Sequence, residues 1–149
     1  MTNVANRDVA ALQRLTRDLL AVAMTTVQEI SDVSMPQMRL LFAVADAGSA
    51  PCGSLAHQLG VAGSSVTRLA DRMVAAGYLD RRHSPDNRSV VLLSLTDSGA
   101  AVIDAVVERR ARIFRDALGE LDPSARAGLL RGLDGLHAAL DAAAQPAER

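Results

Sequence analysis

The chain has 149 residues, about the length of one domain, and 49% of them are hydrophobic, which is enough to bury a core. The formal net charge is −1, so overall basicity does not indicate a nucleic-acid partner and any such site must be local. A single Cys, no leader and no apolar run of membrane length predict a cytoplasmic protein with no membrane partner.

The N-terminal third is expected to be helical. Apolar residues recur there at steps of three and four: Leu12, Leu15, Leu19 and Val22. This spacing predicts a long helix over about residues 7–30. Met35-Pro36 opens a second helix, which runs to Gly48. Residues 48–53 are expected to form a loop that contains Cys52.

Residues 54–77 contain two helical patterns separated by a short turn. Gly60 closes the first pattern as a C-terminal glycine. The apolar residues of the second repeat at helical spacing: Val66, Leu69, Ala70, Met73 and Val74. Two short helices joined by a turn with Gly predict a helix-turn-helix, whose second helix lies in the major groove of DNA.

The second of these helices has a polar face of Ser, Thr and Arg, which suits base edges and phosphates. We predict DNA contacts at Ser64, Ser65, Thr67, Arg68 and Arg72. Because Ala62 and Gly63 precede the helix, Ser64 is a candidate N-cap, which would draw its hydroxyl away from the bases. The alternative is a polar face that is merely solvated.

Residues 78–95 predict a β-hairpin. Strands are expected over 78–82 and 90–95, around a turn cluster of Pro, Asp and Asn. An arginine at a hairpin tip suits a narrow minor groove, so Arg88 is a further predicted DNA contact. Arg82, at the end of the first strand, is assigned to the same DNA-binding site. Asp86 is assigned to the same site, where it pairs with Arg88 or Arg82 and holds the tip in shape, or is only a turn former.

Local charge agrees weakly with this site. Residues 52–99 hold five Arg against four acids, whereas the rest of the chain holds eleven against thirteen. All 16 basic residues are Arg. A guanidinium binds guanine and phosphate in a bidentate way, but genome composition is the alternative cause.

Two more helices are expected after the hairpin. Thr96-Asp97 caps a helix that ends at Gly119, and Asp122-Pro123 begins the last one. Leucines follow one side of this last helix: Leu129, Leu130, Leu133, Leu136 and Leu140. Apolar stripes at both chain ends predict pairing with a second copy, and the alternative is an ordinary intrachain core.

The chain resembles the MarR family of winged helix-turn-helix transcriptional regulators. The segments SLAHQLGVAGSSVTRL, DRMVAAGYLDRR and SPDNRSVVLLSLTDSG carry the resemblance. It implies a mainly α fold with six helices and a small β-hairpin wing, in which residues 35–99 bind DNA. Residues 1–34 and 100–149 would form the homodimer. The resemblance also implies a repressor that binds a pseudo-palindromic DNA operator and is released by a small aromatic or lipophilic effector.

The wing departs from the family pattern. Relatives carry Asp-x-Arg at a fixed distance before a Leu-Thr pair, and here Asp86-Asn87-Arg88 lies one residue further from Leu95-Thr96. In strict register, Asn87 and Ser89 take those positions. Either the tip is remodelled or its arginine is displaced.

The resemblance also implies a ligand cleft between the dimer helices and the winged region. The residues placed near it are Met24, Met35, Met38, Arg39 and Phe42. Met is an adaptable lining, but at helical spacing it also suits a core, and Arg39 can instead pair with an intrachain carboxylate. Some relatives sense oxidants through a thiol, but Cys52 does not match that position and has no basic neighbour in sequence.

No catalytic, metal or cofactor site is predicted. The three histidines show no metal spacing, and no phosphate-binding loop or nucleophile motif is present. The chain is therefore not expected to be an enzyme. The main alternative to a regulator is a winged-helix module that binds a ligand or a protein and has weak DNA affinity.

Overall fold

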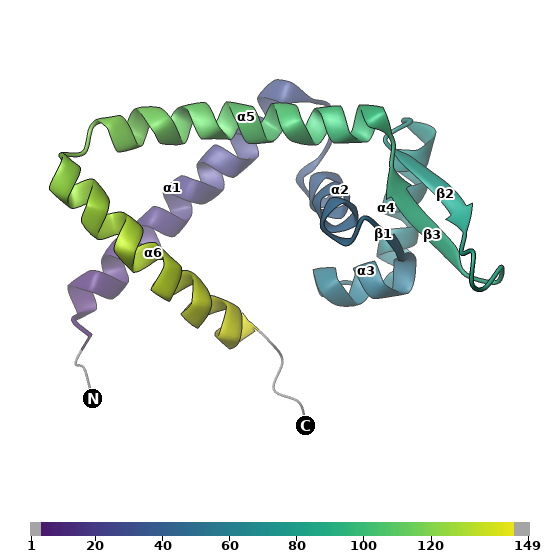
Figure 1. Cartoon of the computed structure of the whole chain (residues 1–149), viewed down its shortest axis with the longest axis horizontal. Helices are drawn as coiled ribbons and strands as arrows, with labels where there is room; N and C mark the ends of the chain where they lie inside the picture. Colours follow the sequence, from purple (N-terminus) through teal and green to yellow (C-terminus); the bar gives the residue numbers. More distant parts are fainter. Residues whose placement is uncertain (1–3, 145–149) are drawn as a thin grey trace. The chain divides into compact units, whose positions relative to one another are not determined.

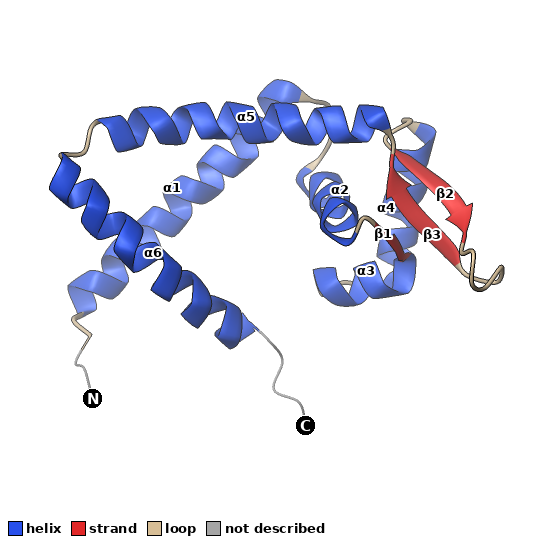
Figure 2. Ribbon diagram, viewed as in Figure 1, coloured by secondary structure: helices blue, strands red, loops and turns tan. Residues whose placement is uncertain are grey.

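A computed structural model describes residues 4–144 (Figure 1). The chain divides into two compact units, Met1–Arg110 and Ala111–Arg149. Six helices and a three-stranded sheet make up the secondary structure of the described residues (Figure 2). The predicted mainly α fold with six helices and a small wing is confirmed.

The first unit begins with four helices. They are α1 (Asn6–Ile30), α2 (Met35–Ala47), α3 (Cys52–Leu59) and α4 (Gly63–Ala75). A reciprocal capping box starts α2, since the Gln37 amide donates to the Ser34 hydroxyl and the Gln37 side chain accepts from the Ser34 amide. Pro36 follows in the first turn, as predicted.

The sheet is antiparallel and has the strand order β1-β3-β2. Its strands are β1 (Ser49–Pro51), β2 (Leu79–His83) and β3 (Val91–Leu95). Strands β2 and β3 pair from Leu79 opposite Leu95 to His83 opposite Val91, which confirms the hairpin with ends shifted by one residue.

The prediction of a loop over residues 48–53 was wrong. Residues Ser49–Pro51 form β1, and Cys52 is the first residue of α3 rather than a loop residue. Three residues are too few to show a strand period, and β1 exists because β3 offers a free edge. Pro51 is tolerated because edge strands accept Pro.

A continuous core joins α2, α3, α4 and the sheet. Its fully buried members include Leu40, Leu41, Leu55, Val66 and Leu93. Val27 of α1 and Val106 of α5 also lie in this cluster. The core therefore fixes α4 and the wing on one scaffold.

Helix α5 (Asp97–Gly119) follows the wing, and α6 (Pro123–Ala144) forms most of the second unit. Thr96 caps α5, since its hydroxyl accepts from the Gly99 amide at 3.0 Å. Asp122 caps α6 by accepting from the amides of Ser124 and Ala125 at 2.9 and 3.1 Å. Both predicted starts are confirmed. No helix within residues 4–144 is long and apolar enough to span a bilayer.

Candidate nucleic-acid interface

Helices α3 and α4 form a helix-turn-helix with a three-residue connection, residues 60–62. Gly60 has a φ of 65°, and its amide donates to the carbonyl of His57 while the Val61 amide donates to Ala56. This pair of bonds is the Schellman ending of a helix, which favours Gly at the left-handed position. The turn glycine therefore has the role that the sequence predicted.

Helix α4 buries one face and leaves the other in solvent. Val66, Ala70 and Met73 are buried against the core. Of the predicted DNA contacts on this helix, Ser64, Thr67, Arg68 and Arg72 are exposed, and Ser65 is half-buried. The fold therefore brings the predicted polar residues of α4 onto one accessible surface.

Ser64 is not the N-cap of α4. Ala62 occupies that position, without a side-chain hydrogen bond, and the helix begins at Gly63. The Ser64 hydroxyl therefore lies in the first turn, and the amides of that turn lack a side-chain partner. The Thr67 hydroxyl donates to the carbonyl of Gly63 at 3.0 Å, so its methyl group and lone pairs remain available.

The connection between β2 and β3 protrudes from the rest of the first unit (Figure 1). Its tip is a turn in which the Val90 amide donates to the Asn87 carbonyl at 2.9 Å. The Asn87 side chain accepts from the Ser89 amide, and Nδ1 of His83 bonds the Arg88 carbonyl at 2.8 Å. Arg88 is thus the second residue of an ordered turn, with its side chain exposed.

The predicted pairing of Asp86 with Arg88 or Arg82 was wrong. Among the described residues, no cation lies within ion-pair distance of its carboxylate, and Arg82 instead approaches Asp80 at 3.7 Å. The Asp86 amide donates a hydrogen bond to the hydroxyl oxygen of Ser84 at 3.3 Å. Local turn bonds, rather than an ion pair, hold the tip.

Arg81 is a residue of this surface that the sequence reasoning missed. It donates to Oδ1 of Asp71 at 2.5 Å and so joins β2 to α4. Side chains two residues apart share a face of a strand, and Leu79 is buried on that face. Strand alternation could have identified Arg81 from the sequence. It puts Arg81 on the same face as Leu79, towards the helix, and Arg82 on the opposite face.

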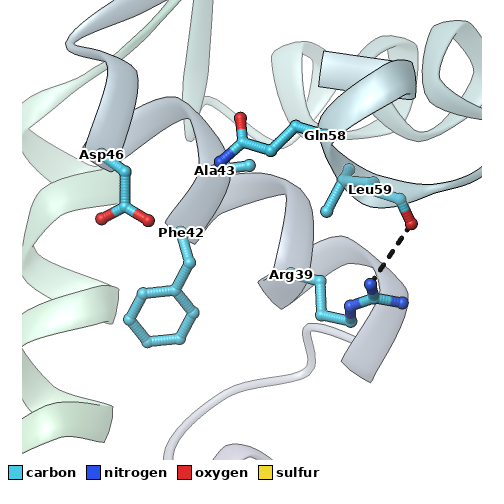
Figure 3. A pocket seen from close by; sticks show the side chains of 6 residues that line it. All are labelled: Arg39, Phe42, Ala43, Asp46, Gln58 and Leu59. Atoms are coloured by element: carbon cyan, nitrogen blue, oxygen red, sulfur yellow. Dashed lines mark hydrogen bonds between the residues drawn. The ribbon is translucent and has the colours of Figure 1, made fainter. Parts of the chain in front are cut away.

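A shallow hollow of about 230 Å³ lies between α2 and α3 (Figure 3). Its lining residues are Arg39, Phe42, Ala43, Asp46, Gln58 and Leu59. The Arg39 guanidinium donates to the carbonyl of Leu59 at 3.3 Å, so its observed partner is a helix C-terminus and not a carboxylate.

Three of the residues assigned to a ligand cleft do not line this hollow. Met38 is fully buried in the core, which matches the alternative expectation for Met at helical spacing. Met35 packs against the same core, and Met24 is exposed on α1. Only Arg39 and Phe42 come together at a concave surface.

Two other features of the described part of the chain bear on a thiol site and on a metal site. Cys52 is a half-buried free thiol at the start of α3. Within residues 4–144, no three His, Cys, Asp or Glu side chains are grouped so as to hold a metal ion.

The sequence of this chain is similar to those of known regulators. Residues 33–91 match the model of the MarR family. YfiV of Bacillus subtilis, an uncharacterized HTH-type transcriptional regulator, is 30% identical over 110 residues, which span 74% of this chain and 69% of YfiV. The chain belongs to the MarR family. The helix-turn-helix and wing described above are therefore those of a MarR-family transcriptional regulator.

Solved structures superpose on nearly the whole chain. RV1404 from Mycobacterium tuberculosis is 30% identical and superposes with a TM-score of 0.84, covering 93% of this chain and 97% of RV1404. A MarR family protein from Bacillus stearothermophilus is 27% identical, with a TM-score of 0.79 and coverage of 93% and 99%.

Proposed function

We propose that this MarR-family protein is a sequence-specific DNA-binding repressor that acts as a homodimer on a pseudo-palindromic operator. In this proposal α4 enters the major groove and the β2–β3 tip reaches the adjacent minor groove. One observation carries the proposal: an exposed face of hydroxyl and guanidinium groups on α4 is fixed, through a shared core, to a protruding tip that bears Arg88.

The chemistry of α4 supports this role. Arg68 can bind guanine O6 and N7 with two hydrogen bonds, and Arg72, one turn further on, suits a phosphate. The methyl group of Thr67 suits the methyl group of thymine. Since no side chain caps the first turn, its amides can donate to a phosphate oxygen, where the helix dipole also favours negative charge.

The wing supports the second contact. The turn bonds of Asn87 and His83 order the backbone on both sides of Arg88, so its guanidinium is presented from a fixed point. Little ordering entropy would then be lost on binding. Arg82 is also exposed and is assigned to the phosphate backbone.

Dimerisation is proposed through residues 1–34 and 100–149, with residues 35–99 as the DNA-binding region. Both ends of the chain leave apolar side chains uncovered. On α1 these include Val9, Leu12, Leu15, Leu19 and Leu20, and on α6 they include Leu129, Leu130, Leu133 and Leu140. A twofold dimer places two recognition helices about 34–36 Å apart, one turn of the duplex.

Release by a small aromatic or lipophilic effector is part of the proposal. The hollow lined by Arg39 and Phe42 offers a cation and an aromatic ring to such a ligand. A coupling of about 1–3 kcal/mol between the two sites changes affinity roughly 5- to 150-fold. Met24, Met35 and Met38 are not required for this version of the effector site.

The test starts with duplexes selected from a random-sequence library by the wild-type protein. Fluorescence anisotropy should show tighter binding to the selected duplex than to random duplex, with an affinity that falls steeply with salt concentration. We expect Arg68→Ala to weaken binding to the selected duplex about 5- to 150-fold and Arg88→Ala to weaken it as well.

Arg14→Ala is the matched control, because Arg14 is an exposed arginine outside the proposed DNA surface and lies on the side of α1 opposite Leu12 and Leu19. It should leave the affinity and its salt dependence unchanged. Equal, weak binding of selected and random duplexes, with no effect of Arg68→Ala or Arg88→Ala, would favour the alternative of a ligand-binding or protein-binding module.

A further inference from the structure

The ion pair between Asp71 and Arg81 is the one side-chain hydrogen bond that joins α4 to the paired strands β2 and β3 among the described residues. Both groups lie at the surface, with 54% of the Asp71 side chain and 38% of the Arg81 side chain exposed. An exposed ion pair contributes little to folding stability. The pair therefore calls for a role other than stabilising the core.

Asp71 is an unfavourable residue for electrostatic binding of DNA. It lies four residues after Thr67 and three after Arg68, so it follows them on the same side of the helix. A carboxylate there repels phosphates and also neutralises Arg81, which would otherwise add to the basic surface. A surface selected only for affinity to phosphates would not contain it.

The pair connects two different DNA-reading elements. Arg81 lies on the same face of β2 as buried Leu79 and opposite buried Leu93, so its stem starts from a rigid part of the sheet. Asp71 belongs to the same helix that buries Val66 and Ala70 in the core. The bond therefore adds a direct side-chain link between β2 and the polar face of α4, beyond the core that both elements share.

On the basis of the proposed DNA-binding function, we propose that Asp71 and Arg81 are positioning residues for sequence discrimination. Their ion pair holds the wing at one angle to the recognition helix, so that major-groove and minor-groove contacts form together only on a matching sequence. The carboxylate of Asp71 lowers general affinity for DNA and, by orienting Arg81, raises the preference for the operator.

The direction in which Asp71→Asn changes affinity for the selected duplex separates this proposal from simple electrostatics. Asp71→Asn keeps the shape of the side chain and removes one negative charge. Electrostatics alone predicts tighter binding to every duplex. The positioning role predicts that affinity for random duplex rises while affinity for the selected duplex falls, by about 1.5- to fivefold, the range that an exposed ion pair can supply.

Asp80→Asn is the matched control. Asp80 is also an exposed wing carboxylate, but its partner Arg82 lies on the same strand, so the substitution removes the same charge without cutting a link between elements. We expect Asp80→Asn to strengthen binding to both duplexes and to leave the ratio of their affinities unchanged. Asp71→Glu, which keeps a carboxylate within reach of Arg81, should retain most of the wild-type ratio.

A double-mutant cycle decides whether Asp71 acts through Arg81. In the Arg81→Gln background, Asp71→Asn should no longer change the ratio of selected to random binding. If Asp71→Asn lowers the ratio equally in both backgrounds, Asp71 contacts the DNA itself and the proposal is wrong. It is also wrong if Asp71→Asn and Asp80→Asn behave alike. Failure of the wild-type protein to prefer any selected duplex would instead overturn the proposed function.

Discussion

At the scale of single residues, the glycine with the least space around it lies where α5 leaves the wing. Gly99 is buried, and a β-carbon there would overlap the carbonyl oxygen of Tyr78 and press on Leu95. The same carbonyl accepts from the Thr96 amide at 3.2 Å, and the Thr96 hydroxyl donates to the carbonyl of Gly77 at 2.6 Å. These contacts connect the end of α4, the base of the wing and the first turn of α5.

Gly99→Ala should therefore destabilise the fold. The backbone carbonyl of Tyr78 cannot move without breaking its bond to Thr96, so we expect a loss of about 1–3 kcal/mol in the free energy of unfolding. Urea denaturation followed by circular dichroism measures it. Gly63→Ala is the control, because a β-carbon at Gly63 meets no atom within 4 Å. Equal midpoints for the two variants would mean that the junction is less rigid than the contacts indicate.

At the scale of secondary-structure elements, the caps were the part of the sequence easiest to interpret. Thr96 and Asp122 start helices at the predicted positions, because a cap needs only a side-chain oxygen and the amides that follow it. The start of α2 was predicted from Pro36, and the structure added the Ser34 cap. Ala62 has no such oxygen, and the start of α4 is set instead by the Schellman turn at Gly60 and by burial of Val66. The prediction that Ser64 is the N-cap of α4 failed because tertiary packing outweighed the preference for a polar cap. Its prediction as a DNA contact is separate.

Asp122 gives α6 a dependence on pH. Hydrogen bonds from the Ala125 amide and from the hydroxyl and amide of Ser124 lower the pKa of Asp122 below its ordinary value of 3.8. A lowered pKa means that the cap stabilises the helix fully above the unfolded value and loses this effect as the pH falls through the folded pKa. Below about pH 4 we expect the amides of Ser124 and Ala125 to lose protection, so that their exchange with solvent approaches the rate of unstructured amides.

Asp122→Asn is the control for this effect. Asn retains a cap oxygen but has no charge to lose, so the acid-dependent change at these two amides should disappear while the helix start remains. Because other carboxylates titrate in the same range, the measurement is made at these amides by NMR rather than on the whole protein. An unchanged acid response in Asp122→Asn would assign it to a different group.

At the scale of the whole molecule, apolar side chains near both ends of the chain are not covered in a single copy. Four leucines of α6 are exposed, Leu129, Leu130, Leu133 and Leu140, whereas Leu136 is half-buried. Added β-carbons at Gly132 and Gly135 would meet no atom within 4 Å. A helix with an uncovered apolar face is marginal in water, because most helical stability comes from packing. This pattern is typical of a surface that is buried in an oligomer.

Leu133→Glu tests the proposed dimer. Leu133 is 42% exposed in the single chain, so the substitution should leave the protomer folded, as circular dichroism would show. In a dimer interface the new carboxylate would be buried without a partner, and we expect the dimer to dissociate at concentrations at least about tenfold higher. Sedimentation velocity measures this change. Arg131→Glu adds a carboxylate on the other side of α6 and should leave the association unchanged, whereas equal behaviour of both variants would place the interface elsewhere.

The sequence by itself determined the order of the helices, the glycine turn, the hairpin and the polar face of α4, because each depends on residues close together in the chain. The tertiary structure alone decided that Ser49–Pro51 form a strand, that Met38 belongs to the core and that Asp86 has no cation as its partner. It also decided that Asp71 of α4 is the partner of Arg81, although strand alternation already indicated that Arg81 and not Arg82 faces the helix. These features depend on which residue of a distant element lies nearby in the fold. The spacing of residues along the chain does not show which elements the fold brings together.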